Sequence, residues 1–414
     1  SSAASDVYKR QVLGYILGVE WEDTTVAFTD HMQEERDSYE GKYMRTTEEA
    51  TPFEAMLAQV GDKIIEYETE KYSSQRLIAF SNWPTTDPLE WDQIVEWYFR
   101  KFEQVDVEHI KTTDEFLSGQ FASYHIYPYF PDYLSFLYYA YQQGEVAQDN
   151  YSKRLTDSEG FLHYMQKVKR YMAESGIEET YPVYVTEWNL TISDRNYIND
   201  TCFKGAYVVK NILDCYPLCE GMALFQGSDR TSEYYDSHDM LYGGTGIITK
   251  DGILKPAGFA FDFLNRLLPY YIGKEENCIL TTDGHGSYGI LCHNAKKLNY
   301  NYYLSAENEL DKENIWKYFE DREAKELAIR LRDVRDGVYQ MKTYSINEKN
   351  GSVLDIWAEM EYESELTRND IKYFRRTCEP RLKIQKVEAK EQTLDLDVTL
   401  AANEIAFIRL KWFA

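Results

Sequence analysis

Five short apolar runs along the first half of the chain each end abruptly in polar or aromatic residues. The runs occupy residues 12–19, 75–82, 121–125, 183–186 and 222–225. Amphipathic segments separate them: one opens at Thr51-Pro52, a second covers 157–175 and ends at Gly176, a third covers 199–216, and a fourth starts at Pro256. Buried strands that alternate with amphipathic helices predict an α/β fold with a parallel sheet.

The residues that follow these runs favour one kind of parallel sheet. They are Glu20-Trp21, Trp83, His125, Glu187-Trp188 and Asp229. Five strands that end in polar or aromatic residues at one edge are typical of a (β/α)8 TIM-type barrel. No Gly-x-Gly-x-x-Gly motif follows any of the predicted strands, which argues against a dinucleotide-binding fold.

A complete barrel has eight strands, so five predicted strands leave a deficit. Either further strands lie in the polar stretches 24–50 and 91–119, or the first three strands lie upstream of this sequence. We favour the second explanation because residues 12–20 already have the pattern of a catalytic strand.

After about residue 275 the pattern changes to short alternating runs separated by turn residues. These runs are 278–282, 288–293, 300–304, 327–331, 339–344, 382–387, 394–400 and 404–410. They predict an antiparallel β-sandwich interrupted by charged helical or loop insertions at 311–326 and 361–374. The predicted domains are a non-native leader at 1–11, a partial barrel at 12–272 and a sandwich at 273–414.

Charge restricts the class of partner. The chain has 414 residues, with 45 Lys and Arg against 70 Asp and Glu, giving a net charge of −25. Such a surface repels phosphate backbones and anionic lipid, which argues against nucleic-acid and membrane partners and suits a neutral or cationic small substrate. The sequence has no long apolar run and no secretory leader, so we expect a cytoplasmic protein, with its oligomeric state left open.

Cysteine and aromatic residues add two observations. The six cysteines show no Cys-x-x-Cys, and Cys215 and Cys219 have no histidine pair nearby, so we expect reduced thiols and no metal site. The 36 Tyr and 8 Trp suit a carbohydrate cleft, although a large core would need them equally.

Two glutamates at strand ends have the pattern of a glycosidase. Retaining glycoside hydrolysis needs one carboxylate as nucleophile and a second as acid and then base. We expect Glu187 to be the nucleophile and Glu20 the acid/base, with no cofactor. The alternatives are that Glu187 caps the next helix and that Glu20 is a solvated loop charge, as any of the three acids Glu20, Glu22 and Asp23 could be.

Other residues at these strand ends are candidates for binding sugar. His125 and Tyr127 could orient Glu187 or bind hydroxyl groups, and Trp83 and Trp188 could stack on a sugar ring. Each has a structural alternative, because a lone histidine is often a core residue and either tryptophan could pack against a helix. Asn189 offers an amide, and Asp229 lies at the last strand end.

Residues 151–414 resemble glycoside hydrolase family 39, the β-xylosidase and α-L-iduronidase family, and in particular its xylosidase-like members, some of which are fused behind a helix-turn-helix regulator. The motifs that carry the resemblance are Val185-Thr186-Glu187-Trp188-Asn189, the run from Asn199 to Tyr207, Gly227-Ser228-Asp229, the run from Ser232 to Ser237, the run from Gly243 to Ile253, and Lys255-Pro256-Ala257. The resemblance implies a retaining mechanism, a (β/α)8 barrel and a C-terminal β-sandwich. It also implies that Glu187 is the nucleophile and that Glu233 lies in a region lining the sugar site.

The first third of the chain departs from that family. The family places its acid/base in a Trp-Asn-Glu-Pro motif, and Leu17-Gly18-Val19-Glu20-Trp21 stands in its place. Residues 12–140 resemble a different, poorly characterised bacterial barrel family, so two parents could join near residues 140–155.

The sequence therefore favours a retaining glycosidase of β-xylosidase type that cleaves terminal sugars from plant-type oligosaccharides by double displacement. The missing motif keeps a non-catalytic glycan-sensing module as an alternative. A third reading is an inactive truncated or chimeric fragment, whose exposed strand edges would promote aggregation.

Overall fold

The computed structural model describes residues 11–89, 103–127, 160–174, 182–230, 237–299, 301, 302, 305 and 309–413. The chain divides into two compact units. The sheet unit comprises Ser1–Ile126, His163–Trp188 and Pro217–Leu224, and the sandwich unit comprises Tyr127–Leu162, Asn189–Tyr216 and Phe225–Ala414. The domain boundary that we placed at residues 272 and 273 stays a prediction.

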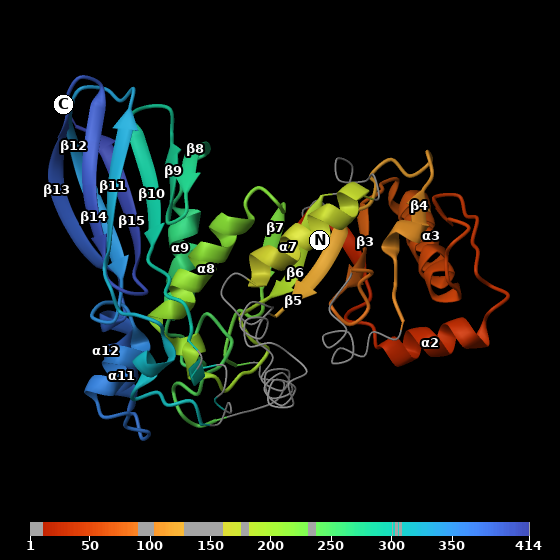
Figure 1. Cartoon of the computed structure of the whole chain (residues 1–414), viewed down its shortest axis with the longest axis horizontal. Coiled ribbons are helices and arrows are strands. Elements are labelled where there is room, and N and C mark those ends of the chain that lie inside the picture. Colours follow the sequence, from red (N-terminus) through yellow and green to blue (C-terminus); the bar gives the residue numbers. More distant parts are fainter. Residues whose placement is uncertain are drawn as a thin grey trace, which may run out of the picture. The chain divides into compact units, whose positions relative to one another are not determined.

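The sheet unit is built on five parallel strands, labelled in Figure 1. They are β1 (Gly14–Leu17), β3 (Leu77–Asn82), β5 (Ala122–Ile126), β6 (Val183–Trp188) and β7 (Gly221–Leu224). Their order in the sheet, β1-β3-β5-β6-β7, is also their order in the chain. All five were predicted from the apolar runs, and sequential parallel neighbours are the arrangement found in a barrel wall.

A closed eight-stranded barrel is not what the described residues form, because this parallel sheet has five strands. Strands do occur in the stretches where the sequence left them open, namely β2 (Met44–Thr46) and β4 (Ile110–Thr112). They pair with each other antiparallel and form a separate two-stranded sheet. They therefore do not supply missing strands of the parallel sheet.

Two helices follow β1 in the sheet unit. The sequence pattern missed α2 (Asp23–Met32) and predicted α3 (Pro52–Tyr72). A capping box starts α3: the Thr51 hydroxyl accepts from the Glu54 amide, and the Glu54 carboxylate accepts from the Thr51 amide. The buried face of α3 packs with β2, β3 and β4 around a core that includes Phe53, Leu57 and Ile78.

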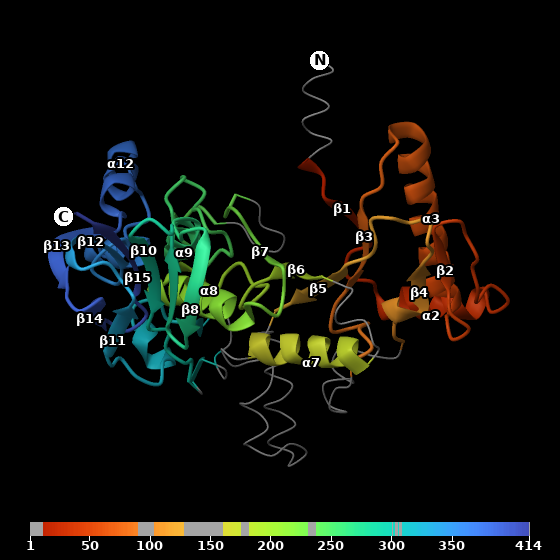
Figure 2. The same cartoon turned by 90° about the horizontal axis from the view of Figure 1, so that it is seen from above.

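Helix α7 (Gly160–Glu174) runs beside β5 and β6, as Figures 1 and 2 show. The ring of Tyr164 meets that of Tyr124 of β5 edge-on at 6.1 Å, and its hydroxyl donates to Asp87 at 2.9 Å. This helix was predicted from its amphipathic pattern, and its end at Gly176 lies outside the described residues.

The sandwich unit contains two antiparallel sheets that share a core. The larger has the order β13-β12-β15-β10-β9-β8, and the smaller pairs β11 with β14. The strands are β8 (Tyr270–Glu275), β9 (Cys278–Thr282), β10 (Ser287–His293), β11 (Lys325–Arg332), β12 (Gly337–Ile346), β13 (Arg381–Ala389), β14 (Thr393–Leu400) and β15 (Ile405–Trp412).

Seven of these strands match predicted runs. The pattern missed β8, and the strand predicted at 300–304 is wrong because Asn301 and Tyr302 are helical. Within the predicted insertions lie the short helix η4 (Ile315–Tyr318) and part of α12 (Arg368–Thr377). Helix α12 and its neighbour α11 (Val353–Glu359) lie at one end of the long strands (Figure 1).

The sandwich unit also contains η2 (Tyr197–Asp200), α8 (Cys202–Cys215) and α9 (Pro256–Asn265). The sequence predicted α8 within the helix at 199–216 and α9 from Pro256, whereas η2 begins before the predicted start. Helices α8 and α9 contact each other and both contact β15. Among the described residues, no helix combines the length and apolarity needed to cross a membrane.

Candidate active site

A β-bulge at the end of β6 sets the direction of Glu187. Tyr124 of β5 pairs with Val185, but the next residue, His125, pairs with Glu187, so Thr186 is extra. A bulge of this kind re-aims the side chains beyond it. Trp188 accordingly turns into the buried layer while the Glu187 side chain keeps 29% of its surface exposed.

A tight turn after β1 presents Glu20. Gly18 and Glu20 both have left-handed backbones, with φ of 81° and 45°. A Cβ on Gly18 would lie 2.0 Å from the indole nitrogen of Trp21, so only glycine fits under that ring. A left-handed glutamate is uncommon outside functional or strained positions, and its side chain remains 32% exposed.

His125 of β5 joins the two glutamates. Its Nδ1 lies 3.1 Å from Glu20 Oε1 and 3.6 Å from Glu187 Oε2, and its ring is 5% exposed. One ligand atom from each of the three residues lies within 4.8 Å of the other two. The structure therefore brings together three of the residues selected from sequence, and they come from strand ends at one edge of the sheet.

This geometry has the parts of two-carboxylate chemistry. In retaining glycosidases the two carboxyl groups lie about 5–5.5 Å apart, whereas inverting enzymes separate them by about 6.5–9.5 Å. One oxygen of Glu20 and one of Glu187 lie within 4.8 Å of each other, which is nearer to the shorter spacing than to the longer one. Both carboxylates are partly exposed, and the buried imidazole lies within hydrogen-bond distance of Glu20 and 3.6 Å from Glu187.

The same three side chains could also ligate a cation. Two carboxylate oxygens and an imidazole nitrogen within 4.8 Å form a donor set that suits zinc or another divalent ion. The sequence predicted no metal, so the group offers two chemistries that an experiment has to separate.

Trp83 supports the turn that carries Glu20. Its indole Nε1 donates to the carbonyl oxygen of Trp21 at 3.0 Å, and its own amide donates to Asn82 Oδ1 at 3.0 Å. Asn82 ends β3 and also donates to the carbonyl of Val105 at 3.0 Å. Sequence reasoning did not select Asn82, although its place directly before Trp83 at a strand end was a usable signal.

Trp188 and Asn189 are fully buried. The amide nitrogen of Asn189 donates to the carbonyl of Phe225, and its Oδ1 accepts from the Leu190 amide at 2.7 Å and from Lys204 Nζ. In this structure the amide thus holds the protein's own backbone. Contact of either residue with sugar stays a prediction.

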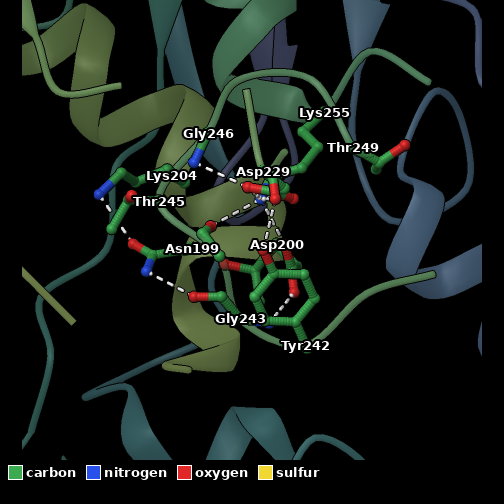
Figure 3. A network of polar contacts seen from close by, with 12 residues as sticks. Asn199, Asp200, Lys204, Asp229, Tyr242, Gly243, Thr245, Gly246, Thr249 and Lys255 are labelled. Carbon is green, nitrogen blue, oxygen red and sulfur yellow. Dashed lines mark hydrogen bonds and ion pairs between the residues drawn. The ribbon is translucent and has the colours of Figure 1, made fainter. Parts of the chain in front are cut away.

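Lys204 of α8 belongs to the polar network of the sandwich unit that Figure 3 shows. Its side-chain nitrogen also donates to Asn199 Oδ1 at 3.0 Å, and the residue is buried. Burial, reinforced by the charge of Lys255, holds the pKa of Lys204 well below its usual value. Sequence reasoning recorded Lys204 only as part of a motif.

Asp229 lies in the same network and is bound by a lysine. Lys255 Nζ lies 3.0 Å from Asp229 Oδ2 and 2.6 Å from Asp200 Oδ1, and all three side chains have no exposed surface. Burial raises the pKa of Asp200 to about 6, with Lys255 opposing that rise and Asp229 adding to it. Burial alone would lower the pKa of Lys255, but the two aspartates raise it.

The glycine-rich motif at 243–246 wraps this ion cluster. The amide of Gly243 donates to Asp200 Oδ2 and that of Gly246 to Asp229 Oδ1, each at 2.8 Å (Figure 3). A Cβ on Gly246 would lie 2.3 Å from the amide nitrogen of Asp229, so the close backbone approach excludes any side chain. With its carboxylate so occupied, the sugar contact expected of Asp229 stays a prediction.

Two further candidates have different outcomes. Tyr127 is buried, and its ring meets that of Phe225 edge-on at 6.5 Å. Glu233 lies outside the described residues. Their proposed contacts with sugar stay predictions.

Comparisons with known proteins place this geometry in context. The family model described as glycosyl hydrolases family 39 matches residues 128–393. A β-xylosidase from Geobacillus stearothermophilus is 21% identical over 280 residues, covering 64% of this chain and 51% of that protein. An uncharacterized HTH-type transcriptional regulator from Staphylococcus aureus is 21% identical over 238 residues, covering 56% of this chain and 29% of its own length. The chain thus spans about a third to a half of these relatives.

Solved structures resemble the fold. A monomeric β-xylosidase from Caulobacter crescentus CB15 has a TM-score of 0.59 and 15% identity, covering 86% of this chain and 74% of that one. A GH39 enzyme from Xanthomonas axonopodis pv. citri has a TM-score of 0.58 and 16% identity, covering 88% and 74%. At such identities the likeness concerns the fold.

Proposed function

The chain belongs to glycosyl hydrolase family 39, and from this premise we propose that it is a retaining glycoside hydrolase of β-xylosidase type acting on terminal sugars of plant-type oligosaccharides. The observation that carries the proposal is the approach of Glu20 and Glu187 to within 4.8 Å, with His125 between them. The similar proteins from Geobacillus and Caulobacter are β-xylosidases, which supports the choice of xyloside.

In the first step, Glu187 attacks the anomeric carbon and the glycosidic bond breaks. Glu20 gives its proton to the departing oxygen, and a covalent glycosyl ester forms on Glu187. In the second step, Glu20, now a carboxylate, takes a proton from water, and the water oxygen displaces Glu187 from the anomeric carbon. Two inversions restore the original configuration.

His125 has a positioning role in this scheme. An ionised carboxylate can only accept, so Nδ1 must carry a hydrogen to bond with Glu20 at 3.1 Å. When Glu20 is protonated, the same N–H is available to the charged Glu187 at 3.6 Å. One buried donor thereby serves whichever carboxylate is ionised in a given step.

The test uses an activated aryl β-xyloside and its 2-deoxy-2-fluoro analogue, which slows the second step. We expect phenol release from the first compound and, with the second, one covalent sugar on Glu187 by intact mass and peptide mapping. Glu220→Gln is the matched control, because Glu220 is an exposed glutamate of the same unit. A folded protein that shows neither release nor labelling with a panel of aryl glycosides refutes the hydrolase.

A glycan-sensing module is the second candidate, favoured by the staphylococcal relatives that are named as transcriptional regulators. The two functions separate in one titration. Sensing predicts saturable binding of xylo-oligosaccharide with no hydrolysis and no change in affinity for Glu187→Gln, whereas hydrolysis predicts product formation that this variant abolishes.

A further inference from the structure

Two cysteines face each other across the β9–β10 hairpin of the sandwich unit. Cys278 begins β9, and its partner in the antiparallel register is Cys292 near the end of β10. Side chains of directly opposed residues project from the same face of a sheet. Cys292 is part of the shared core of the two sheets, and Cys278 packs against that core.

The hydrogen bonds of the hairpin define what kind of pair this is. The amide of His293 donates to the carbonyl of Asn277 at 3.0 Å. His293 and Asn277, which are the next opposed pair along the hairpin, therefore form a hydrogen-bonded pair. Because the two kinds of pair alternate, Cys278 and Cys292 form a non-hydrogen-bonded pair, in which the Cα atoms are about 4.5 Å apart. Disulfides bridge Cα atoms about 4.4–6.8 Å apart, so the backbone already permits the bond.

The two thiols differ in access and in acidity. Cys278 is partly exposed, whereas Cys292 has no exposed surface. A hydrogen bond from Cys292 lowers the pKa of the Cys278 thiol, and the same contact together with burial raises the pKa of Cys292 well above its usual value. A small oxidant would therefore meet Cys278 first, and as the better nucleophile.

We propose that Cys278 and Cys292 are a site of reversible oxidative modification, closing a cross-strand disulfide when the protein meets a peroxide. This site is independent of the glutamate pair and of the proposed hydrolase activity.

The reaction balances with hydrogen peroxide as the two-electron oxidant. The Cys278 thiolate attacks one peroxide oxygen, the O–O bond breaks, and hydroxide leaves and is protonated to water, which gives a sulfenic acid. The sulfur of Cys292 then attacks the sulfur of Cys278, the S–O bond breaks, and the departing hydroxide takes the thiol proton to form a second water. Two thiols are oxidised to one disulfide, and a dithiol reductant reverses the change.

The experiment treats the whole protein with hydrogen peroxide, alkylates it in denaturant, and maps tryptic peptides without reduction. No Lys or Arg lies between Glu275 and Lys296, so one peptide carries both cysteines. We expect that peptide to lose two hydrogens and to escape alkylation, and dithiothreitol to restore two alkylation sites. Cleavage before Asp283 should then give two halves joined only in the oxidised sample.

Variants provide the controls. In Cys278→Ser we expect Cys292 to stay alkylatable after peroxide, whereas Cys219→Ser should leave the disulfide unchanged. The cross-link should also raise the melting temperature by roughly 3–10 °C, because it closes a short loop in the unfolded chain. Overoxidation of Cys278 to sulfinic acid with Cys292 still alkylatable would overturn the proposal, and so would two alkylated thiols after peroxide.

Discussion

Two clusters of acidic residues in this protein have opposite environments. In the sheet unit, Glu20 and Glu187 keep about a third of their side-chain surface exposed, and both lie close to the imidazole of His125. In the sandwich unit, Asp200 and Asp229 are fully buried on the ammonium of Lys255. Both clusters pair two carboxylates with one nitrogen base, so residue type alone does not distinguish them.

The difference shows what separates chemistry from architecture. A carboxylate that must attack a substrate and exchange protons with water has to remain accessible. Its hydrogen-bond partner must also be able to release it during the reaction. A buried carboxylate is tolerated only when a charge and amide donors satisfy it permanently. Lys255 supplies the charge for Asp200 and Asp229, and the Gly243 and Gly246 amides donate the hydrogen bonds. We therefore expect the proposed catalysis to involve the first cluster, and we expect the second cluster to contribute to stability.

The largest expected effect is on turnover through Glu187. Glu187→Gln should lower kcat for an aryl β-xyloside by roughly 10⁴–10⁶-fold, as loss of a covalent nucleophile does in other enzymes. The melting temperature should change little because the side chain is partly exposed. Turnover within tenfold of wild type would show that Glu187 is not the nucleophile. It would also contradict the distinction between a catalytic and a structural cluster.

A smaller effect on turnover is expected from Glu20. Glu20→Gln should lower the hydrolysis of glycosides with poor leaving groups by about 10²–10⁴-fold, the usual contribution of a general acid. A nitrophenyl xyloside, whose leaving group needs little protonation, should lose much less in the first step, and azide should rescue the second. Glu22→Gln is the matched control, because Glu22 is exposed beside it. Equal losses for both substrates would contradict the acid assignment.

Loss of Lys255 should act on stability. Lys255→Met leaves two buried carboxylates without their counterion and should reduce the free energy of unfolding by about 3–5 kcal/mol in denaturant titrations. Lys349→Met, at an exposed position, should stay within about 0.5 kcal/mol of wild type. Adding Asp200→Asn and Asp229→Asn to Lys255→Met should recover part of the loss. A loss no larger than that of the control would show that this cluster is not structural.

The pH dependence of stability gives a finer test of the buried cluster. The pKa of Asp200 is raised to about 6 in the folded protein, and it is near 3.9 in an unfolded chain. Because the folded state holds the proton more tightly, the contribution of Asp200 is fully present below about pH 4 and is lost as the pH rises through about 6. The unfolding free energy of wild type relative to Asp200→Asn should therefore fall by about 2–3 kcal/mol over that range. A difference that rises with pH would have the wrong sign.

The smallest expected effect is that of a chelator. If Glu20, His125 and Glu187 act as a carboxylate pair with a positioning histidine, dialysis against EDTA should leave kcat and KM unchanged. Loss of activity that added zinc restores would instead make this group a metal centre, and the comparison of the two clusters would have to be redrawn.

Local signals in the sequence located most of the elements. The five parallel strands were visible as apolar runs, and Thr51-Pro52 marked the start of α3, because strand burial and helix capping depend on residues only a few positions apart. Alternating runs likewise identified seven strands of the sandwich unit. The runs failed at 300–304 and missed β8, whose apolar residues Tyr270, Tyr271 and Ile272 remain exposed and follow no burial pattern.

The sequence by itself determined which strand ends carry acids, and it selected Glu187, Glu20 and His125. Only the tertiary structure decided that these three meet and that a bulge at Thr186 directs Glu187 away from the buried layer. It also decided that Asp229 forms a buried ion pair with Lys255. The physical reason is that local sequence encodes periodicity and caps. The register between strands, and the choice of a counterion from residues far apart in the chain, depend instead on how the whole sheet and its loops pack.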